Sequence, residues 1–383
     1  MEIIILYFIL FLVVHLVSKQ FKHAGKARLF QLVSCFILLF GFFGFRDITV
    51  LNDTPHYYGY YYQLARVKSY SESSIFVYKL LLNLEYGYQV MQHILIKYVS
   101  KEPFTIIILS SLIITWGNIR FISHNTRNIA LAFFMLLISG ILFDQYCLIR
   151  QSIALMFFYS AYPYLQQKKH KPYVSLIIIA AFFHMSVLVL LILPLIQRIP
   201  VTKRNIALVL GAAVIFSFIV YETFRLIGLS EWKYFVMNMK RDTFPVAAVL
   251  DGTMMLSIIM CCFFIYKKTG MEHYDKTTLW TAVFGLCICI ITPSFLSFFR
   301  LNIFIWPIIY ITFFKLTTGD AIELGMQRPQ MPLRRLILIS VLALLMLRIS
   351  IILAFRNEWY HLIPYSFYDF SDHFHNFNIY WEK

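Results

Sequence analysis

Long apolar runs separated by short polar segments follow one another along most of the chain. Because lipid cannot satisfy the backbone of an exposed strand edge, we expect each run to be a helix. Several runs are shorter than the roughly 20 residues that span a bilayer, so their ends should extend into the flanking residues. The runs are Ile3–Val17, Leu29–Phe45, Phe104–Ile119, Ile129–Phe143, Tyr146–Leu165, Tyr173–Ile196, Ile206–Val220, Val246–Tyr266, Thr277–Ile291, Leu301–Phe314 and Leu336–Ala354.

The composition agrees with this pattern. Of the 383 residues, 60% are hydrophobic and only 14% are charged, whereas soluble domains are roughly half apolar. The sequence has no repeat, low-complexity linker or soluble domain, so we predict one all-α integral membrane domain over residues 1–383 with about 10 transmembrane helices. The first run lacks a basic segment and a cleavage site, and we expect a retained helix there rather than a signal peptide.

Lysine and arginine predict which loops face the cytoplasm, because these residues are enriched in the cytoplasmic loops of membrane proteins. Six loops are basic, namely 18–28, 120–127, 166–172, 197–205, 267–276 and 315–335. They hold 19 of the 34 Lys and Arg residues but only 4 of the 19 acidic residues. If all six are cytoplasmic, the net charge of +15 lies on that side and both termini lie outside.

One apolar run has to turn back for this arrangement to hold. The run Tyr173–Ile196 lies between two basic loops, 166–172 and 197–205, and a single crossing would put them on opposite sides. The run is long for one span and carries His184 at its middle. We therefore predict a re-entrant hairpin of two short helices that meet around His184, since broken helices are tolerated where they line a protein cavity.

The remaining polar segments then form the outer face. They are the long loop 46–102, the turn around Asp144–Gln151, a second loop 221–245, the turn Pro293–Arg300 and the tail 355–383. The long loop includes the amphipathic segment YGYQVMQHILIKYV, which we expect to lie in the membrane interface. The aromatic residues of the tail either form an interfacial belt or bind sugar.

The segment Arg46–Tyr62, RDITVLNDTPHYYGYYY, is a polar island in this apolar sequence. It carries an arginine, two carboxylates, a histidine and a row of tyrosines, and we interpret it as part of a site for a sugar and a phosphate. Asp53 is a candidate general base for a sugar hydroxyl, but it also precedes Pro55, where a helix N-cap is expected. Glu85, in LEYGYQ, is a second candidate carboxylate or an interfacial cap.

Three arginines lie at outer helix ends beside other polar groups, and these are Arg46, Arg150 and Arg300. A guanidinium is always charged and offers a fork of donors that suits a diphosphate. Each of the three either binds such an anionic group or forms a structural ion pair, for example Arg46 with Asp47 or Arg150 with Asp144.

His184 is an ionisable residue in the middle of an apolar run, where such a side chain is either hydrogen-bonded between helices or functional. Histidine is well suited to acid–base catalysis. The chain has no phosphate-binding glycine loop, no dinucleotide fingerprint, and no HExxH motif or His/Cys cluster. We therefore expect no cofactor, no metal ion and no nucleic-acid partner, and a donor substrate that is already activated and held in the membrane.

Five stretches, in order, resemble the EpsG family, the Wzy-like polymerases of bacterial exopolysaccharide and O-antigen synthesis. They are FRDITVLNDTPHYYGYY, LEYGYQVMQHIL, LIRQSIALMFFYSAYPYL, KKHKPYVSLIIIAAFFHMSVLVLLILP and RLNIFIWP. Their order and spacing together are more specific than any one stretch. One difference is Asn52, which stands where the family has a glycine before the aspartate. Asparagine tolerates a positive φ nearly as well as glycine, so we expect the turn to be kept.

The resemblance implies a GT-C-like, multi-pass glycosyltransferase of the bacterial cytoplasmic membrane. Such enzymes join repeat units carried on undecaprenyl diphosphate at the outer face, to make exopolysaccharide, capsule or O-antigen. It also implies a chain-length regulator and a flippase of the same pathway as partners. The alternatives are a flippase or transporter of lipid-linked oligosaccharide, a membrane acyltransferase that modifies a surface polysaccharide, and a non-catalytic member of a synthesis complex.

These interpretations together predict the site. The catalytic candidates are Asp53, His184 and Arg150, with Asp53 or His184 as the base that deprotonates the acceptor hydroxyl and the arginines as the groups that stabilise the leaving diphosphate. The substrate-binding candidates are Arg46, Asp47, Tyr57, Tyr58, Glu85, Gln151, Arg300 and Asn302.

Overall fold

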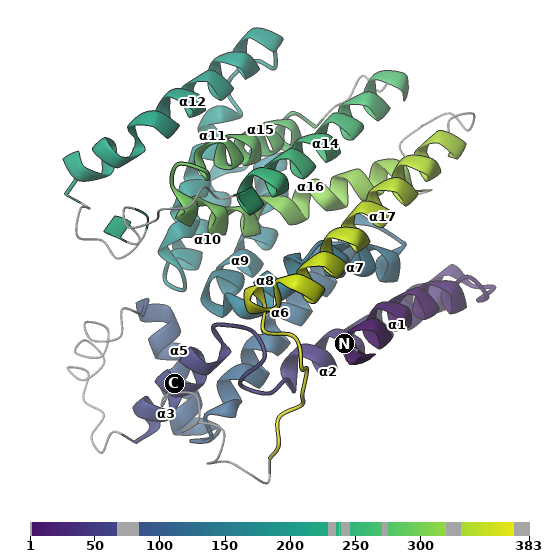
Figure 1. Cartoon of the computed structure of the whole chain (residues 1–383), viewed down its shortest axis with the longest axis vertical. Helices are drawn as coiled ribbons and strands as arrows, with labels where there is room; N and C mark the ends of the chain where they lie inside the picture. Colours follow the sequence, from purple (N-terminus) through teal and green to yellow (C-terminus); the bar gives the residue numbers. More distant parts are fainter. Residues whose placement is uncertain are drawn as a thin grey trace. The chain divides into compact units, whose positions relative to one another are not determined.

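The computed structural model is almost entirely helical (Figure 1) and describes residues 2–66, 84–228, 235–236, 238, 246–269, 275–318 and 331–370. Parts of three predicted outer segments therefore lie outside the described residues, namely 67–83, then 229–234, 237 and 239–245, and finally 371–383. The chain folds into two compact units. Unit 1 comprises Met1–Ala161, Ser175–Leu188 and Ser340–Lys383, and unit 2 comprises Tyr162–Val174 and Val189–Ile339.

Every apolar run of the sequence is helical over most of its length. The helices are α1 (Glu2–Ser18), α2 (Ala24–Gly44), α6 (Phe104–Asn125), α7 (Ile129–Ile138), α9 (Ile149–Gln166), α10 (His170–Ala181), α12 (Lys203–Leu226), α14 (Val246–Thr269), α15 (Lys276–Ile291), α16 (Asn302–Thr317) and α17 (Met331–Phe355). Within the described residues, six helices are long and apolar enough to cross a membrane, and one bent pair is a seventh candidate. Three further apolar helices are shorter, so the expected count of about ten spans stays a prediction.

The run Ile129–Phe143 is bent, although the sequence pattern predicts a single helix. Helix α7 ends at Ile138, α8 (Ile141–Cys147) follows at 76°, and Gly140 between them has a φ of 85°. Glycine adopts this left-handed conformation without the steric cost that a Cβ brings. Nη1 of Arg348 donates to the carbonyl oxygen of Ser139 at 3.1 Å, which satisfies one free carbonyl at the end of α7.

The chain turns back near His184, as the charge pattern predicts. Helix α10 ends at Ala181, and after a break the 3₁₀ helix η1 (Met185–Ile192) and the short α11 (Leu193–Ile196) follow. The two ends of this segment meet in unit 2. Tyr173 Oη donates to Leu190 O at 2.8 Å, and Gln197 Nε2 donates to Leu165 O at 3.1 Å. The basic loops that flank the segment therefore start side by side.

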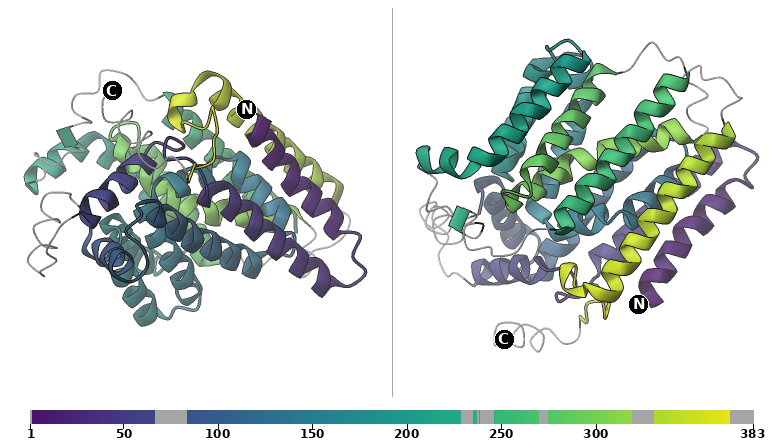
Figure 2. Two further views of the ribbon diagram at one scale, coloured as in Figure 1. Left: turned by 90° about the horizontal axis from the view of Figure 1, so that it is seen from below. Right: turned by 45° about the horizontal axis from the view of Figure 1, so that its top comes forward.

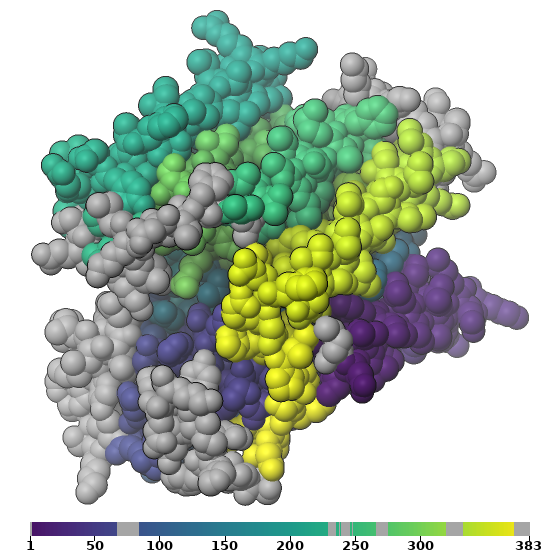
Figure 3. All heavy atoms as spheres, in the orientation of Figure 1, coloured from purple at the N-terminus to yellow at the C-terminus, as the bar shows by residue number. Residues whose placement is uncertain are grey.

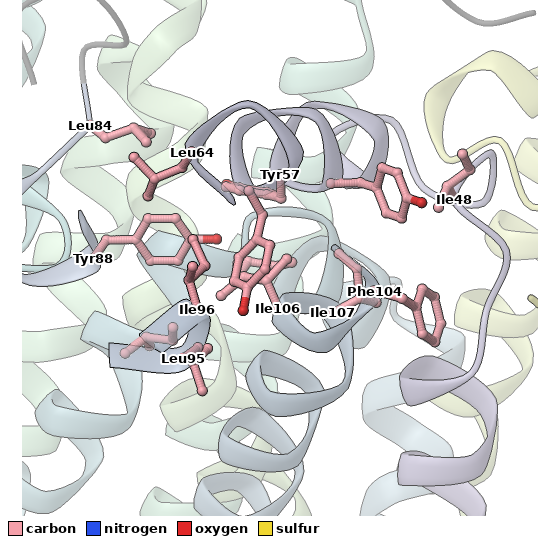
Figure 4. Packing of buried hydrophobic residues seen from close by; sticks show 14 of the residues in the cluster. Ile48, Tyr57, Leu64, Leu84, Tyr88, Leu95, Ile96, Phe104, Ile106 and Ile107 are labelled. Atoms are coloured by element: carbon pink, nitrogen blue, oxygen red, sulfur yellow. The ribbon is translucent and has the colours of Figure 1, made fainter. Parts of the chain in front are cut away.

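Unit 1 is built around α2 and α6, which pack against each other, while α1 packs against α2 and α7 (Figure 2). Two further helices, α3 (Thr54–Ala65) and α5 (Tyr86–Tyr98), form in the predicted outer loop and contact α6. Their inner faces share a buried cluster (Figure 4) that includes Tyr57, Tyr61, Tyr88, Leu95 and Phe104. The amphipathic segment that we expected at the interface is thus packed on protein along one face.

The segment that follows α17 lies across the first outer loop (Figure 3). The backbone nitrogen of Asp47 donates to Ser366 O and that of Tyr368 donates to Phe45 O, both at 2.9 Å. The ring of Tyr368 stacks on Phe104 with ring centroids 3.8 Å apart. At least this tail tyrosine is therefore used for internal packing, a role that neither an interfacial belt nor a sugar site describes.

Unit 2 is centred on α15, which packs against α12, α14 and α16. Most residues of α15 are buried, and Trp280 is among the largest buried side chains of the protein. Helix α12, in contrast, exposes large apolar side chains such as Leu208 and Phe218. An exposed apolar helix of this length suits contact with lipid.

Candidate functional site

Glu85 lies at the start of α5 and joins two basic side chains of unit 1. Its Oε1 accepts a hydrogen bond from Nδ1 of His184 at 2.7 Å, and its Oε2 forms an ion pair with Nη1 of Arg150. The side-chain exposures are 14% for Glu85, 20% for Arg150 and 22% for His184. The cluster is therefore largely shielded from solvent but still reachable.

The local sequence explains how Glu85 comes so close to His184. The backbone nitrogen of Gly87 donates to Phe182 O at 2.8 Å, and a Cβ on residue 87 would lie 2.8 Å from the same oxygen. Glycine thus allows the first turn of α5 to approach the turn that carries His184. Glu85 occupies the N-cap position of α5 in an extended conformation, and its side chain makes no capping bond. The carboxylate instead contacts His184 and Arg150.

Arg150 stands in the first turn of α9, where α8 has ended and a new helix begins. Besides the ion pair with Glu85, its guanidinium forms a hydrogen bond with the hydroxyl of Tyr57 in α3. The ring of Tyr57 meets that of Tyr88 edge-on, with centroids 5.9 Å apart and an interplanar angle of 65°. Helices α3, α5 and α9 therefore hold Arg150 between a carboxylate and a phenol.

The surroundings of the cluster fix its charge states. Burial acts to raise the pKa of Glu85, but the hydrogen bond from His184 and the positive charge of Arg150 outweigh it, so the pKa is lowered and the group is a carboxylate at neutral pH. Burial raises the pKa of Tyr57 and of Tyr88, although Arg150 acts against it, and both phenols stay protonated. Because a carboxylate can only accept, Nδ1 of His184 donates this hydrogen bond, and in the neutral imidazole Nε2 is then the acceptor that can serve as a base.

Asp53 lies next to this cluster on the side of Tyr57. It occupies the expected N-cap position of α3, but its side chain makes no capping hydrogen bond. Together with burial, the negative charge of the half-buried Asp53 helps to raise the pKa of Tyr57. Whether Asp53 acts as a base stays a prediction.

Arg46 points into the protein, contrary to the expectation that it faces an anionic ligand. It is 0% exposed, and its guanidinium donates to Ser111 Oγ at 3.1 Å, to Tyr146 O at 3.0 Å, to Thr54 Oγ1 at 3.2 Å and to Phe43 O. Burial lowers its pKa to about 10, so the side chain remains charged at neutral pH. Arg46 ties the end of α2 to α3, α6 and α8, and in this structure it does not present a diphosphate-binding fork.

Three other predicted binding residues are also buried. Oδ1 of Asp47 accepts from the backbone nitrogen and the hydroxyl of Thr49, at 3.0 and 2.6 Å, and not from Arg46. The hydroxyls of Tyr58 and Tyr368 lie 3.3 Å apart, and Gln151 is 3% exposed. The fold thus uses Asp47 and Tyr58 in local packing.

Arg300 and Asn302 belong to unit 2. Arg300 is an exposed residue in the 3₁₀ helix η2 (Leu296–Leu301), and Asn302 is 3% exposed at the start of α16. Their predicted meeting with Arg150 therefore stays a prediction.

Sequence reasoning found Glu85, Arg150 and His184 as single residues but not as one cluster. It did not single out Gly87 or Tyr88. The signal was present in the string EYGYQ, where a glycine stands two residues after a carboxylate at a predicted helix start. A glycine at a helix start indicates that another backbone segment approaches closely there. The tyrosine next to it, Tyr88, then lies near the same contact.

The fold and the site define a polytopic helical membrane protein that keeps an arginine, a carboxylate and a histidine together where several helices begin or end. The model of the EpsG family matches residues 29–367, and the chain belongs to the EpsG family. The suspected resemblance is thereby confirmed, and it relates the chain to exopolysaccharide formation. No curated protein and no solved structure matches the chain.

Proposed function

We propose that this chain is a membrane glycosyltransferase that joins oligosaccharide repeat units carried on undecaprenyl diphosphate into an exopolysaccharide, capsule or O-antigen. The observation that carries the proposal is the contact of one carboxylate, Glu85, with both Arg150 and His184. Family membership supports the polysaccharide substrate class. The reaction would occur at the outer face of the bacterial cytoplasmic membrane, with both termini outside.

In the proposed reaction, a hydroxyl of the incoming repeat unit attacks the anomeric carbon of the growing chain. The new bond joins this carbon to the acceptor oxygen, and the bond between the carbon and the diphosphate oxygen breaks. The hydroxyl proton passes to Nε2 of His184, and the leaving diphosphate takes the electron pair. Arg150 stabilises the negative charge that develops on the diphosphate.

Glu85 would serve both partners in this mechanism. Its hydrogen bond to Nδ1 holds the tautomer and orientation in which Nε2 of His184 accepts a proton. Its ion pair holds Arg150 in place before the diphosphate arrives. A carboxylate of this kind compensates the charge of the imidazolium after proton transfer.

Polymer length in cells tests this proposal. Arg150→Ala and His184→Ala should leave single repeat units on their lipid carrier at the outer face, while expression of the chain is kept. The matched control is Arg225→Ala, because Arg225 forms an exposed pair with Glu222 at 3.7 Å in α12 and lies outside the cluster. Long polymer in both cluster variants contradicts the proposal, and repeat units that stay at the cytoplasmic face indicate a flippase instead.

A membrane acyltransferase is the second candidate, because the Glu85–His184 pair would also activate a hydroxyl for acyl transfer. The two functions predict different products. For an acyltransferase, His184→Ala leaves polymer length unchanged and removes acyl groups from the polysaccharide. Mass analysis of the polymer from the variant distinguishes these results.

A further inference from the structure

Tyr88 is a completely buried tyrosine whose hydroxyl makes no hydrogen bond to any part of the chain that the structure describes. It lies one turn into α5, three residues after Glu85. Its ring packs against Tyr57, and the charges of Arg150 and Glu85 act on its hydroxyl. Figure 4 shows Tyr88 among the packed side chains of α3, α5 and α6, and its ring neighbour Tyr57 is the residue that bonds Arg150.

A buried hydroxyl without a partner lowers stability, because it has lost its bonds to water and gained none in return. A phenylalanine would fill the same space without this cost. The next turn of α5 repeats the pattern, since Gln92 is 0% exposed and neither end of its amide has a partner among the described residues. Most buried polar groups in proteins are hydrogen-bonded, so an exception calls for an explanation such as a catalytic role or a bound ion.

The donors around Tyr88 indicate what that ligand is. The Tyr88 hydroxyl stays protonated, because burial raises its pKa. The guanidinium of Arg150 carries only donors, and the oxygen of Tyr57 is occupied by Arg150, which leaves the Tyr57 proton to donate. The carboxylate of Glu85 also lies here, but its two oxygens already accept from His184 and Arg150. The remaining positive charge and phenolic donors suit a group that only accepts, such as a phosphate oxygen.

We propose that the hydroxyl of Tyr88 donates a hydrogen bond to a phosphate oxygen of the lipid diphosphate beside Arg150. This assignment rests on the proposed function, and it adds Tyr88 as a substrate-contacting residue. It also gives a reason for the aromatic pair of Tyr57 and Tyr88, which keeps water away from the diphosphate and strengthens the bonds from its donors.

Tyr88→Phe in the purified full chain tests the assignment through two measurements, which would both fall if Tyr88 only supported the fold. The first is the melting temperature with and without inorganic pyrophosphate. The second is turnover of a lipid-linked repeat unit. We expect an unchanged or higher melting temperature without pyrophosphate, loss of the pyrophosphate-induced rise, and a fall in turnover of roughly 10- to 100-fold, as removal of one hydrogen bond to a charged group predicts.

Tyr61→Phe is the matched control. Tyr61 is also 0% exposed and belongs, like Tyr88, to the buried hydrophobic cluster of α3 and α5, but its hydroxyl donates to Ser100 O at 2.6 Å. Loss of this hydrogen bond in Tyr61→Phe should lower the melting temperature, and the pyrophosphate-induced rise should be kept. The two tyrosines thus predict opposite results from the same substitution.

Two outcomes separate this assignment from the proposed function. A lower melting temperature of Tyr88→Phe with an unchanged pyrophosphate effect and unchanged turnover overturns the assignment, and loss of polymer in Arg150→Ala would still support the polymerase. If the wild-type chain makes no polymer from lipid-linked repeats, the polymerase proposal is overturned. The anion contact still holds in that case if pyrophosphate raises the melting temperature of the wild type but not that of Tyr88→Phe.

Discussion

Replacement of Glu85 by glutamine removes the one negative charge that Arg150 and His184 share. The amide has nearly the same shape, so packing around the start of α5 is kept. Its single oxygen can accept from one of the two partners, and its NH₂ group cannot accept from the other. Arg150 then keeps Tyr57 as a partner but loses its counter-charge.

The magnitude follows from the exposure of the three side chains. Removal of one partner from a fully buried ion pair costs about 3–5 kcal/mol. Here the side chains are 14%, 20% and 22% exposed, so water screens part of the effect. We expect the free energy of unfolding to fall by about 1–3 kcal/mol. Because His184 also loses the group that orients it, we expect turnover to fall by roughly 10²–10⁴-fold.

Thermal unfolding of the purified chain and turnover of a lipid-linked repeat unit measure the two effects. The matched control is Glu222→Gln. Glu222 is 65% exposed and pairs with Arg225 at 3.7 Å, so the same chemical change should alter neither quantity. If Glu85→Gln keeps both its melting temperature and its turnover, the carboxylate neither compensates Arg150 nor orients His184, and our reasoning about the cluster is wrong.

Three further predictions follow from the same contacts. Gly87→Ala places a Cβ 2.8 Å from Phe182 O, so it should lower the free energy of unfolding by about 1–3 kcal/mol and shorten the polymer. Gly25→Ala is the control, because nothing lies within 4 Å of its added Cβ, and it should change neither stability nor polymer length. Arg46→Met should lower stability by roughly 3–5 kcal/mol in thermal unfolding, and loss of polymer at an unchanged melting temperature would instead show that Arg46 contacts substrate. Because the pKa of Glu85 is lowered, its contribution to stability is complete above the ordinary value of 4.5 and is lost as pH falls further, a dependence that Glu85→Gln should lack.

The burial of Arg46 shows one limit of sequence reasoning. An arginine that follows an apolar run and precedes an aspartate looks as if it leaves the membrane toward solvent. The structure turns it inward, where hydroxyl and carbonyl oxygens from four separate segments accept its hydrogen bonds. The sequence gives no sign of these oxygens, because backbone carbonyls are present at every residue and only the fold decides which are free.

The tyrosines of α3 and α5 show a related limit. Their types indicated a polar, aromatic site, and Tyr57 does contact Arg150. However, the same residue type serves different purposes at Tyr58, Tyr61 and Tyr88, where the hydroxyl meets another tyrosine, a carbonyl oxygen or no described partner. Only the packing of each ring distinguishes these cases.

The sequence by itself determined that the chain is a helical membrane protein, because long apolar runs have no other stable form in lipid. Its charge pattern also predicted a turn near His184, because the basic loops on either side of that run were expected on one face of the membrane. The sequence further predicted the family that the family model confirms. The tertiary structure alone decided which polar residues meet. Glu85 lies 65 residues from Arg150 and 99 from His184, and their contact depends on Gly87 and on two helix breaks far apart in the chain. Local periodicity cannot encode such a meeting, because it arises only when separate helices pack.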